Sequence, residues 1–317
     1  MKPIPMLPAY RHGAMTPWGS DALKRVYGRE IPEEVTGEAL EVSAVPGLES
    51  RTPEGETLPE LMVRYGTALT GEGYEKEFPL LLKLLAAKTP LSVQVHPDDA
   101  YARVHENGKL GKTEAWVILQ AEEGAELLYG IREGVTREEL AKALESGEDV
   151  EPLIARRKVQ PGDVLYMPAG MVHAIGGGIL LYEIQQSSDV TYRLWDYNRT
   201  NDKGEKRPLH IRQSLDVVRP ELKGQTARMP EGDGNDVTRL LDVPAFRLDC
   251  LRVQGSLAVP REEGTFGILT AFGSLKLLCS DGTEMPLKNG DTLLLPAQGE
   301  DWVLSGCGKA LLSRPGK

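Results

Sequence analysis

The chain lacks long apolar stretches. No segment of its 317 residues approaches the roughly 20 consecutive apolar residues that span a bilayer. Residues 1–5 also lack the apolar core of a signal peptide. We therefore predict a soluble, cytoplasmic protein with no membrane as a partner.

Cysteine is scarce. The three cysteines, Cys250, Cys279 and Cys307, lie far apart and show none of the close-paired spacings of a metal site. An odd number of cysteines suits a reducing compartment. We interpret all three as ordinary thiols without a functional role.

Positive charge is in deficit, because 37 Lys and Arg stand against 47 Asp and Glu and give a formal net charge of −10. Nucleic acids and anionic membranes bind clustered Lys and Arg, so neither is expected as a partner. The chain also has no glycine-rich phosphate loop. A phosphorylated substrate would have to meet a local cluster of cations, for which the candidates are Lys112, Arg193, Arg199 and Lys203.

Glycine and proline are abundant, with 34 and 22 residues, and such frequent interruption favours short strands joined by turns. The chain is therefore predicted to be mainly β. Three helices are expected as additions around the sheets. They are a segment from residue 58 to about 69 capped by Thr57, a segment that opens at 97–99 and runs through 104, and a segment that opens with the capping box at Thr136 and ends near Gly147.

The segment 162–173 carries glycines, a proline and a terminal histidine at fixed intervals. It predicts a turn, a short apolar strand over 164–167, a second turn around Pro168 and Gly170, and His173 at the start of the next strand. Such a rigid unit can hold an imidazole in place, so this segment supplies half of a possible metal site.

Two upstream segments supply further polar side chains. Residues 90–99 alternate apolar and polar side chains, which places Ser92, Gln94 and His96 on one face of a strand. Residues 111–119 do the same and bring together Lys112, Glu114 and Trp116. The nitrogen and oxygen ligands that zinc accepts are then Gln94, His96, Glu114 and His173. Two histidines and a carboxylate leave an exchangeable position, whereas glutamine is a poor ligand in general.

The segments 91–98, 111–116, 162–173 and 191–197 together resemble type I mannose-6-phosphate isomerase, also called phosphomannose isomerase, in its shorter bacterial form within the cupin superfamily. The resemblance covers about two thirds of the chain. It implies that Gln94, His96, Glu114 and His173 bind one zinc ion, that Arg193 is catalytic, and that the partner is a small phosphorylated sugar. We expect a monomer or a weak homodimer.

The segment 290–297 echoes the segment 162–169, which indicates an internal repeat. In this register the counterpart of His173 is Asp301, and no histidine follows His210. We therefore predict two cupin-type jelly-roll barrels. Residues 1–230 would form the catalytic domain with its helical additions, and residues 231–317 a degenerate domain without metal.

The predicted reaction interconverts mannose 6-phosphate and fructose 6-phosphate through an enediol. Glu183 is the first choice for the general base, although a salt bridge across the barrel would also explain a carboxylate in an apolar strand. Arg193 is catalytic in this hypothesis, or else an ion-pair partner of Asp189 or Asp196. Lys112 and Ser92 are candidates to hold the phosphate or neighbouring hydroxyls.

Two alternatives stay open at the level of sequence. One is a cupin that binds metal and sugar without chemistry. The other is an isomerase for a different aldose phosphate such as glucose 6-phosphate, since the two sugars share the phosphate and the enediol.

Overall fold

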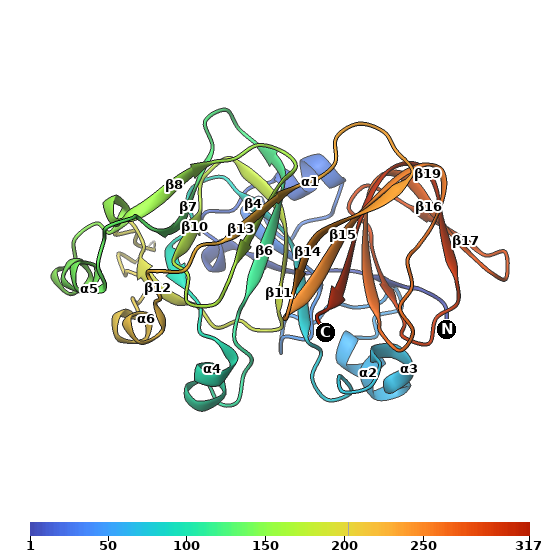
Figure 1. Cartoon of the computed structure of the whole chain (residues 1–317), viewed down its shortest axis with the longest axis horizontal. Coiled ribbons are helices and arrows are strands. Elements are labelled where there is room, and N and C mark those ends of the chain that lie inside the picture. The colour runs from blue at the N-terminus through green and yellow to red at the C-terminus, as the bar shows by residue number, and fades with distance from the viewer. Residues whose placement is uncertain (202) are drawn as a thin grey trace.

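The protein consists mainly of antiparallel sheets, which confirms the predicted mainly β fold. The computed structural model describes residues 1–201 and 203–317. Figure 1 shows two halves side by side, one of them formed largely by the C-terminal strands in orange and red. No helix among these residues is long and apolar enough to cross a membrane. The arrangement as two cupin barrels stays a prediction.

The first half contains two of the three sheets. The seven-stranded sheet has the order β13 (Gln225–Arg228), β9 (Asp163–Met167), β6 (Glu114–Ala121), β11 (Ile179–Gln186), β4 (Leu80–Ala87), β3 (Thr36–Val42) and β2 (Ala9–His12). The five-stranded sheet has the order β12 (Tyr192–Trp195), β5 (Val93–Val95), β10 (His173–Ile175), β7 (Glu126–Ile131) and β8 (Ile154–Lys158).

The second half contains one seven-stranded sheet. Its order is β1 (Ile4–Met6), β18 (Thr292–Leu295), β16 (Gly267–Cys279), β19 (Trp302–Pro315), β15 (Phe246–Ala258) and β14 (Asp236–Val243), with β17 (Glu284–Leu287) paired to β16. Its edge strand β1 therefore comes from the other end of the chain, where Ile4 lies opposite Leu294.

Short helices decorate the sheets. They are α1 (Ala22–Tyr27), α2 (Leu58–Tyr65), α3 (Thr67–Thr70), α4 (Asp99–His105), α5 (Arg137–Ser146) and α6 (Ile211–Val217), with 3-10 turns η1 (Gly13–Met15) and η2 (Glu151–Leu153). The predictions for α4 and α5 are confirmed, including the Thr136 capping box and the end of α5 at Gly147. The single helix predicted over 58–69 is wrong, because Gly66 with φ +51° and ψ −134° divides it into α2 and α3.

The repeated segments fold alike at their first turn. Gly162 and Gly290 both have positive φ, of 92° and 87°, which a glycine adopts without steric cost. The aspartate that follows each glycine accepts a hydrogen bond from the backbone N–H three residues earlier, at 3.0 Å for Asp163 and 2.8 Å for Asp291. Each turn then leads into a buried strand, β9 or β18.

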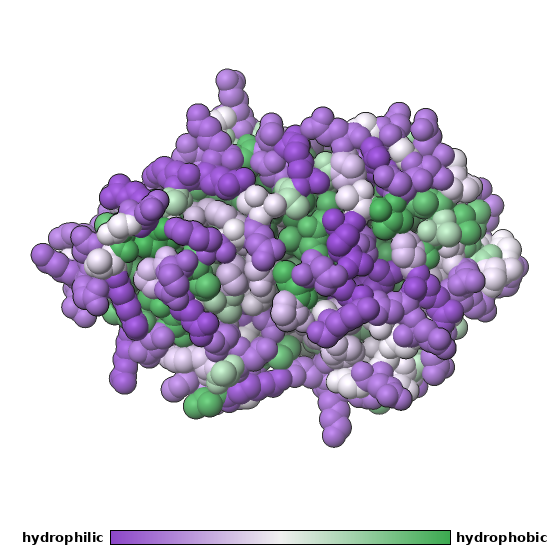
Figure 2. Space-filling model, in the orientation of Figure 1, coloured by the Kyte–Doolittle hydropathy of each residue, from purple (hydrophilic) through white to green (hydrophobic). Residues whose placement is uncertain are grey.

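Strand β11 separates the core between the halves from the interior of the first half. Its residues Tyr182 and Ile184 belong to a core shared with Phe246 and Leu248 of the second half, and the Tyr182 hydroxyl lies 2.8 Å from the Ser313 hydroxyl. Because side chains alternate along a strand, Glu183 points the other way, into the first half. Hydrophilic residues cover most of the face shown in Figure 2, with hydrophobic ones visible between them.

Candidate metal centre and its pocket

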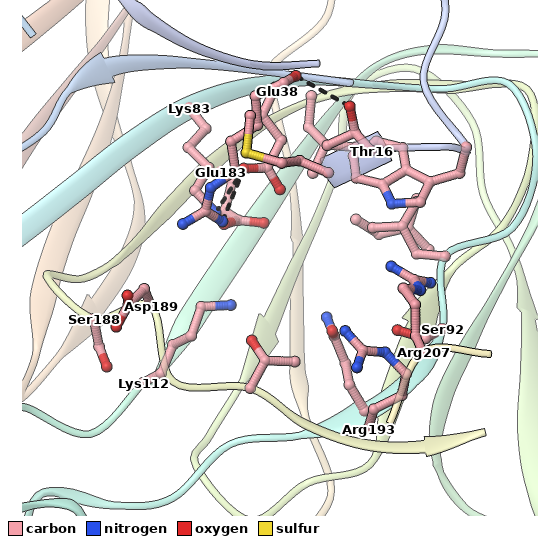
Figure 3. Close-up of a pocket in the computed structure, with 18 residues that line it drawn as sticks. Thr16, Glu38, Lys83, Ser92, Lys112, Glu183, Ser188, Asp189, Arg193 and Arg207 are labelled. Carbon is pink, nitrogen blue, oxygen red and sulfur yellow. Dashed lines mark hydrogen bonds and ion pairs between the residues drawn. The ribbon is translucent and has the colours of Figure 1, made fainter. Parts of the chain in front are cut away.

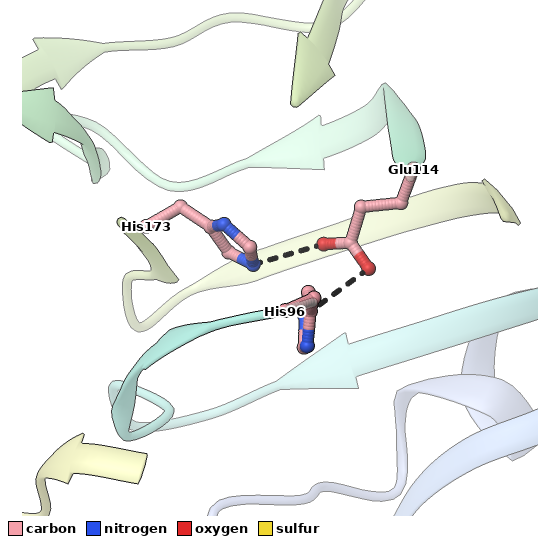
Figure 4. Close-up of side chains that lie close together, drawn as sticks. All are labelled: His96, Glu114 and His173. Carbon is pink, nitrogen blue, oxygen red and sulfur yellow. Dashed lines mark ion pairs between the residues drawn. The ribbon is translucent and has the colours of Figure 1, made fainter. Parts of the chain in front are cut away.

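Three buried side chains converge in the interior of the first half. His96 follows β5, Glu114 begins β6 and His173 begins β10, and one ligand atom of each lies within 4.8 Å of the others. The Glu114 carboxylate lies between the two imidazoles (Figure 4), 3.0 Å from Nε2 of His173 and 3.5 Å from Nε2 of His96. The structure thus brings together three of the four predicted ligands.

Backbone carbonyls fix the tautomers of both histidines. Nδ1 of His96 lies 2.9 Å from the Val190 carbonyl oxygen, and Nδ1 of His173 lies 2.9 Å from that of Met171. A carbonyl can only accept, so each Nδ1 carries the hydrogen and each Nε2 presents a lone pair toward Glu114. Holding the outer ring nitrogen in this way is typical of histidines that bind metals.

The carboxylate of Glu114 has one oxygen without a donor. Oε1 of Glu114 is buried and accepts no hydrogen bond within the described part of the chain, although Nε2 of His173 is only 3.0 Å away. Two lone pairs facing each other at this distance call for a cation between them. The residues present therefore fit a metal ion bound by two imidazole nitrogens and one carboxylate.

Burial and charge keep His96 and Glu114 in the form that a metal requires. Burial and the nearby Lys112 ammonium lower the pKa of His96 well below its usual value, so its imidazole is neutral. Burial alone would raise the pKa of Glu114, but the Lys112 ammonium opposes it, and the pKa lies well below the usual range. The carboxylate is therefore ionised.

Lys112 and Gln94 flank the three ligands. Nζ of Lys112 lies 3.0 Å from Nε2 of His96 and also contacts the Glu114 carboxylate. Nε2 of Gln94 lies 3.4 Å from Nε2 of His173. A half turn of the Gln94 carboxamide would present its oxygen there instead. The predicted ligand role of Gln94 thus stays a proposal, but the side chain is adjacent.

A cavity of about 250 Å³ opens beside this centre (Figure 3). Ser92, Gln94, Lys112, Glu183 and Arg193, all predicted from the sequence, line it. Its charged residues comprise five cations and three carboxylates. They are Arg11, Lys83, Lys112, Arg193 and Arg207, together with Glu38, Glu183 and Asp189.

Glu183 lies on the pocket wall between two donors. It stands directly opposite Lys83 of β4 and Trp116 of β6. Lys83 Nζ is 2.9 Å from Oε1 of Glu183, and Trp116 Nε1 donates to Oε2 at 3.1 Å. Lys83 also faces Glu38 at 3.6 Å. The ion pair that the sequence left open is therefore present, and it lies within the pocket.

Arg193 has neither of the ion pairs considered for it. Asp196 pairs with Arg199 and Arg207 instead, and Asp189 pairs with Lys109. In the described residues, Nε of Arg193 is buried without an acceptor, and Nη1 donates to the Pro208 carbonyl at 2.9 Å. Burial and the neighbouring Arg207 lower the pKa of Arg193. Its charge is therefore incompletely balanced.

Several pocket residues were not predicted from the sequence. Two of the predicted phosphate-binding cations do not line the pocket. Arg199 binds Asp196 and the Pro90 carbonyl, and neither it nor Lys203 lines the cavity. Arg207 does line it, and so does Lys83. A signal for Lys83 was available, because it is the one charged residue of the apolar strand β4, as Glu183 is in β11.

Comparison with known proteins agrees with this geometry. A family model for the catalytic domain of type I phosphomannose isomerase matches residues 7–121. A mannose-6-phosphate isomerase of Streptococcus mutans is 37% identical over 91% of this chain and 92% of its own length. One of Bacillus subtilis is 38% identical over 93% and 94%.

The fold is also similar to that of a solved mannose 6-phosphate isomerase. The crystal structure of the mannose 6-phosphate isomerase of Bacillus subtilis superposes with a TM-score of 0.87 and 34% identity, over 99% of both chains. The chain therefore belongs to the type I phosphomannose isomerase family, whose members are mannose-6-phosphate isomerases.

Proposed function

We propose that the protein interconverts mannose 6-phosphate and fructose 6-phosphate with one zinc ion at His96, Glu114 and His173. The observation that carries this proposal is the buried trio with aligned Nε2 lone pairs beside a cationic pocket. Zinc accepts this set of nitrogen and oxygen ligands, and Gln94 is proposed as the fourth. Zinc would act as a Lewis acid on the sugar oxygens at the reacting carbons.

Glu183 is proposed as the base that moves the proton between carbons 1 and 2 through the enediol. Its carboxylate lines the pocket and is held by Lys83 and Trp116, so that it does not depend on substrate for its orientation. General acid-base help of this kind is typically worth about 100- to 10,000-fold.

Arg193 is proposed to stabilise the negative charge that develops on the sugar oxygens. Its guanidinium is half-buried and without a carboxylate partner among the described residues. A fixed cation with spare donors costs no reorganisation when charge appears on the substrate.

The phosphate group is proposed to lie where positive charge is in excess. Arg207 shares Asp196 with Arg199, close to Arg193 and Ser92 in Figure 3. Lys112 lies beside the metal ligands, which favours a contact with sugar hydroxyls near the reacting carbons. Binding energy from the phosphate contacts, remote from the reaction, would orient the carbons between which the proton moves.

Further features stay proposals from the sequence. They are the catalytic domain at 1–230, the metal-free domain at 231–317, the two cupin barrels, the monomer or weak dimer and the cytoplasmic location. The contrast between the two repeated segments, of which only the first leads to a histidine, supports the assignment of catalysis to the first domain.

The decisive experiment is a coupled assay for fructose 6-phosphate from mannose 6-phosphate, before and after chelation and zinc restoration. Activity that disappears with chelator and returns with zinc is expected. A folded, zinc-loaded protein that binds the sugar but exchanges no substrate hydrogen in deuterated water would support the binding cupin instead. Faster turnover of glucose 6-phosphate would support the other isomerase.

A further inference from the structure

A second charged cavity lies in the C-terminal sheet, apart from the pocket of the first half. Its volume is about 510 Å³, within the range of small-molecule sites. Strands β14, β15 and β19 form its wall, and the segment around Pro260 borders it. On β15, Leu251 and Val253 belong to the apolar core of this sheet, and the alternation of side chains places Arg247 and Asp249 on the same face, at the end of that core.

Two arginines of this cavity lie directly opposite each other. Arg247 of β15 pairs in register with Arg314 of β19, and the two side chains are buried, with exposed fractions of 4% and 5%. Like charges directly opposite on neighbouring strands destabilise a sheet, and burial increases the cost of each charge. The fold keeps this pair despite the cost, which calls for a compensating negative charge.

The carboxylates of the cavity compensate only part of this charge. Arg239, Arg247, Arg261, Arg314 and Lys317 line it, against two acids. Asp249 is shared by Arg239 and Arg314, while Glu262 is shared by Arg247 and Lys317. Arg261 forms no ion pair within the described part of the chain. Arg239 also pairs with Asp242, which lies outside the cavity lining. Five cations are therefore balanced by three carboxylates, in a protein whose net charge is −10.

The guanidinium groups keep donors for a ligand. Arg247 uses Nε for the Pro315 carbonyl and Nη1 for Glu262, which leaves the hydrogens of Nη2 available. Burial and the neighbouring Arg247 lower the pKa of Arg314 in spite of Asp249, as expected where positive charge is undercompensated. Arginine forks suit the paired oxygens of phosphate and carboxylate groups.

We propose that this cavity binds the phosphate group of a small metabolite, with Arg247, Arg314 and Arg261 as its main donors. The site is independent of the reaction in the first half, and its ligand stabilises the C-terminal sheet by balancing the buried arginines. A dianion would balance the two positive charges that Asp249, Glu262 and Asp242 leave uncompensated.

Isothermal titration of inorganic phosphate into the zinc-loaded full chain tests this inference. Arg261→Ser removes an exposed donor, and Arg247→Met removes a buried one while leaving Glu262 paired with Lys317. We expect the cavity site to weaken about 3- to 10-fold in the first variant and more than about 10-fold in the second, since a charge-assisted hydrogen bond contributes roughly a factor of ten or more.

Lys276→Ser is the matched control, because Lys276 lies in the same sheet outside the cavity and pairs with Glu284 on the surface. It should bind phosphate like the parent. Phosphate binding in the substrate pocket is separated from that in the cavity by a two-site fit, since the cavity variants should weaken one site and leave the affinity of the other unchanged. Arg261→Ser and Arg247→Met proteins with the parent's stoichiometry and affinity would overturn the proposal. Arg261→Ser, being on the surface, guards against a failure of Arg247→Met to fold.

Discussion

The two repeated turns of this chain lead to different surroundings, a cluster of polar side chains in the first half and an apolar core in the second. After β9 the chain delivers His173 to Glu114 and His96, whereas after β18 the corresponding position is Asp301, followed by the buried Trp302. Trp302 packs with Leu304 in the apolar core of the second sheet. The same turn therefore precedes a proposed metal ligand in one half and a residue of the hydrophobic core in the other, and the residues after the turn make the difference.

The buried charges of the two halves differ as well. In the first half Glu183, Lys83, Glu38 and Arg11 alternate in sign along the pocket wall. In the second half Arg247 and Arg314 face each other with the same sign. Alternating charges stabilise one another, so the first arrangement is complete before a ligand arrives. The second is stabilised by an added anion.

The largest expected effect comes from removing a metal ligand at the first turn. His173→Ala should lose zinc and lower turnover by more than about 100-fold, since even partners behind metal ligands are worth 10- to 100-fold. The matched change at the second turn is Asp301→Ala, which should alter neither. Zinc content by mass spectrometry and the coupled assay measure both. Full activity of His173→Ala would refute the metal site.

The next largest effects come from exchanging two buried carboxylates, one in the pocket and one between the halves. Glu183→Gln should lower kcat about 100- to 10,000-fold and keep its zinc. Glu41→Gln affects a carboxylate between the halves, bound by Arg29 at 2.9 Å and by Thr292 at 3.2 Å. It should lower the free energy of unfolding by about 3–5 kcal/mol and leave kcat unchanged. Normal kcat in Glu183→Gln would reduce that residue to an ion-pair partner.

The packing role of the second turn is tested by Trp302→Ala. Its side chain is 4% exposed, and removing a buried tryptophan typically costs about 3–5 kcal/mol. Urea unfolding should show this loss, while the folded fraction keeps its zinc and its turnover. Lost turnover in fully folded Trp302→Ala protein would mean that the second sheet contributes to the reaction.

The smallest effect concerns acid stability. Burial would raise the pKa of Asp196, but Arg207 and Arg199 outweigh it and lower the pKa. A lowered pKa in the folded state contributes stability above the unfolded value, near 4, and this contribution is lost as the pH falls through the folded pKa. Asp196→Asn should therefore cost about 1–3 kcal/mol at pH 7 and flatten the loss of stability below pH 4 to 5.

Asp236 of the second half is the control for this experiment, because it pairs with Arg252 on the surface. Exposed pairs contribute little. Asp236→Asn should therefore change the loss of stability at low pH less than Asp196→Asn does. Thermal unfolding from pH 3 to 7 measures both. If the stability of the parent and of Asp196→Asn fell equally steeply with pH, the pKa of Asp196 would not be lowered by folding.

Local patterns in the sequence were enough to predict the three side chains that converge in the candidate metal centre. Alternation along 90–99 and 111–119 placed His96 and Glu114 on inward faces, and the turn at 162–170 placed His173. These features depend on the geometry of a single strand or turn. The capped helices α4 and α5 were predictable for the same reason, since a cap is a local interaction.

The remainder of the pocket depends on strand pairing between distant segments. Lys83 meets Glu183 because β4 pairs with β11, and Arg11 reaches Glu38 because β2 pairs with β3. No local pattern specifies those neighbours. The break at Gly66 was missed because an apolar periodicity continues across it, and only the backbone angles of the glycine reveal it.

The pairing of β1 with β18 has a consequence for how the chain folds. This ladder joins residues near opposite ends of the sequence, and contacts of such separation close large loops and form late. During synthesis, β1 emerges first and waits without its partner strand until β18 has been made. A fusion placed directly before Ile4 should therefore slow the completion of the C-terminal sheet more than it disturbs the metal centre.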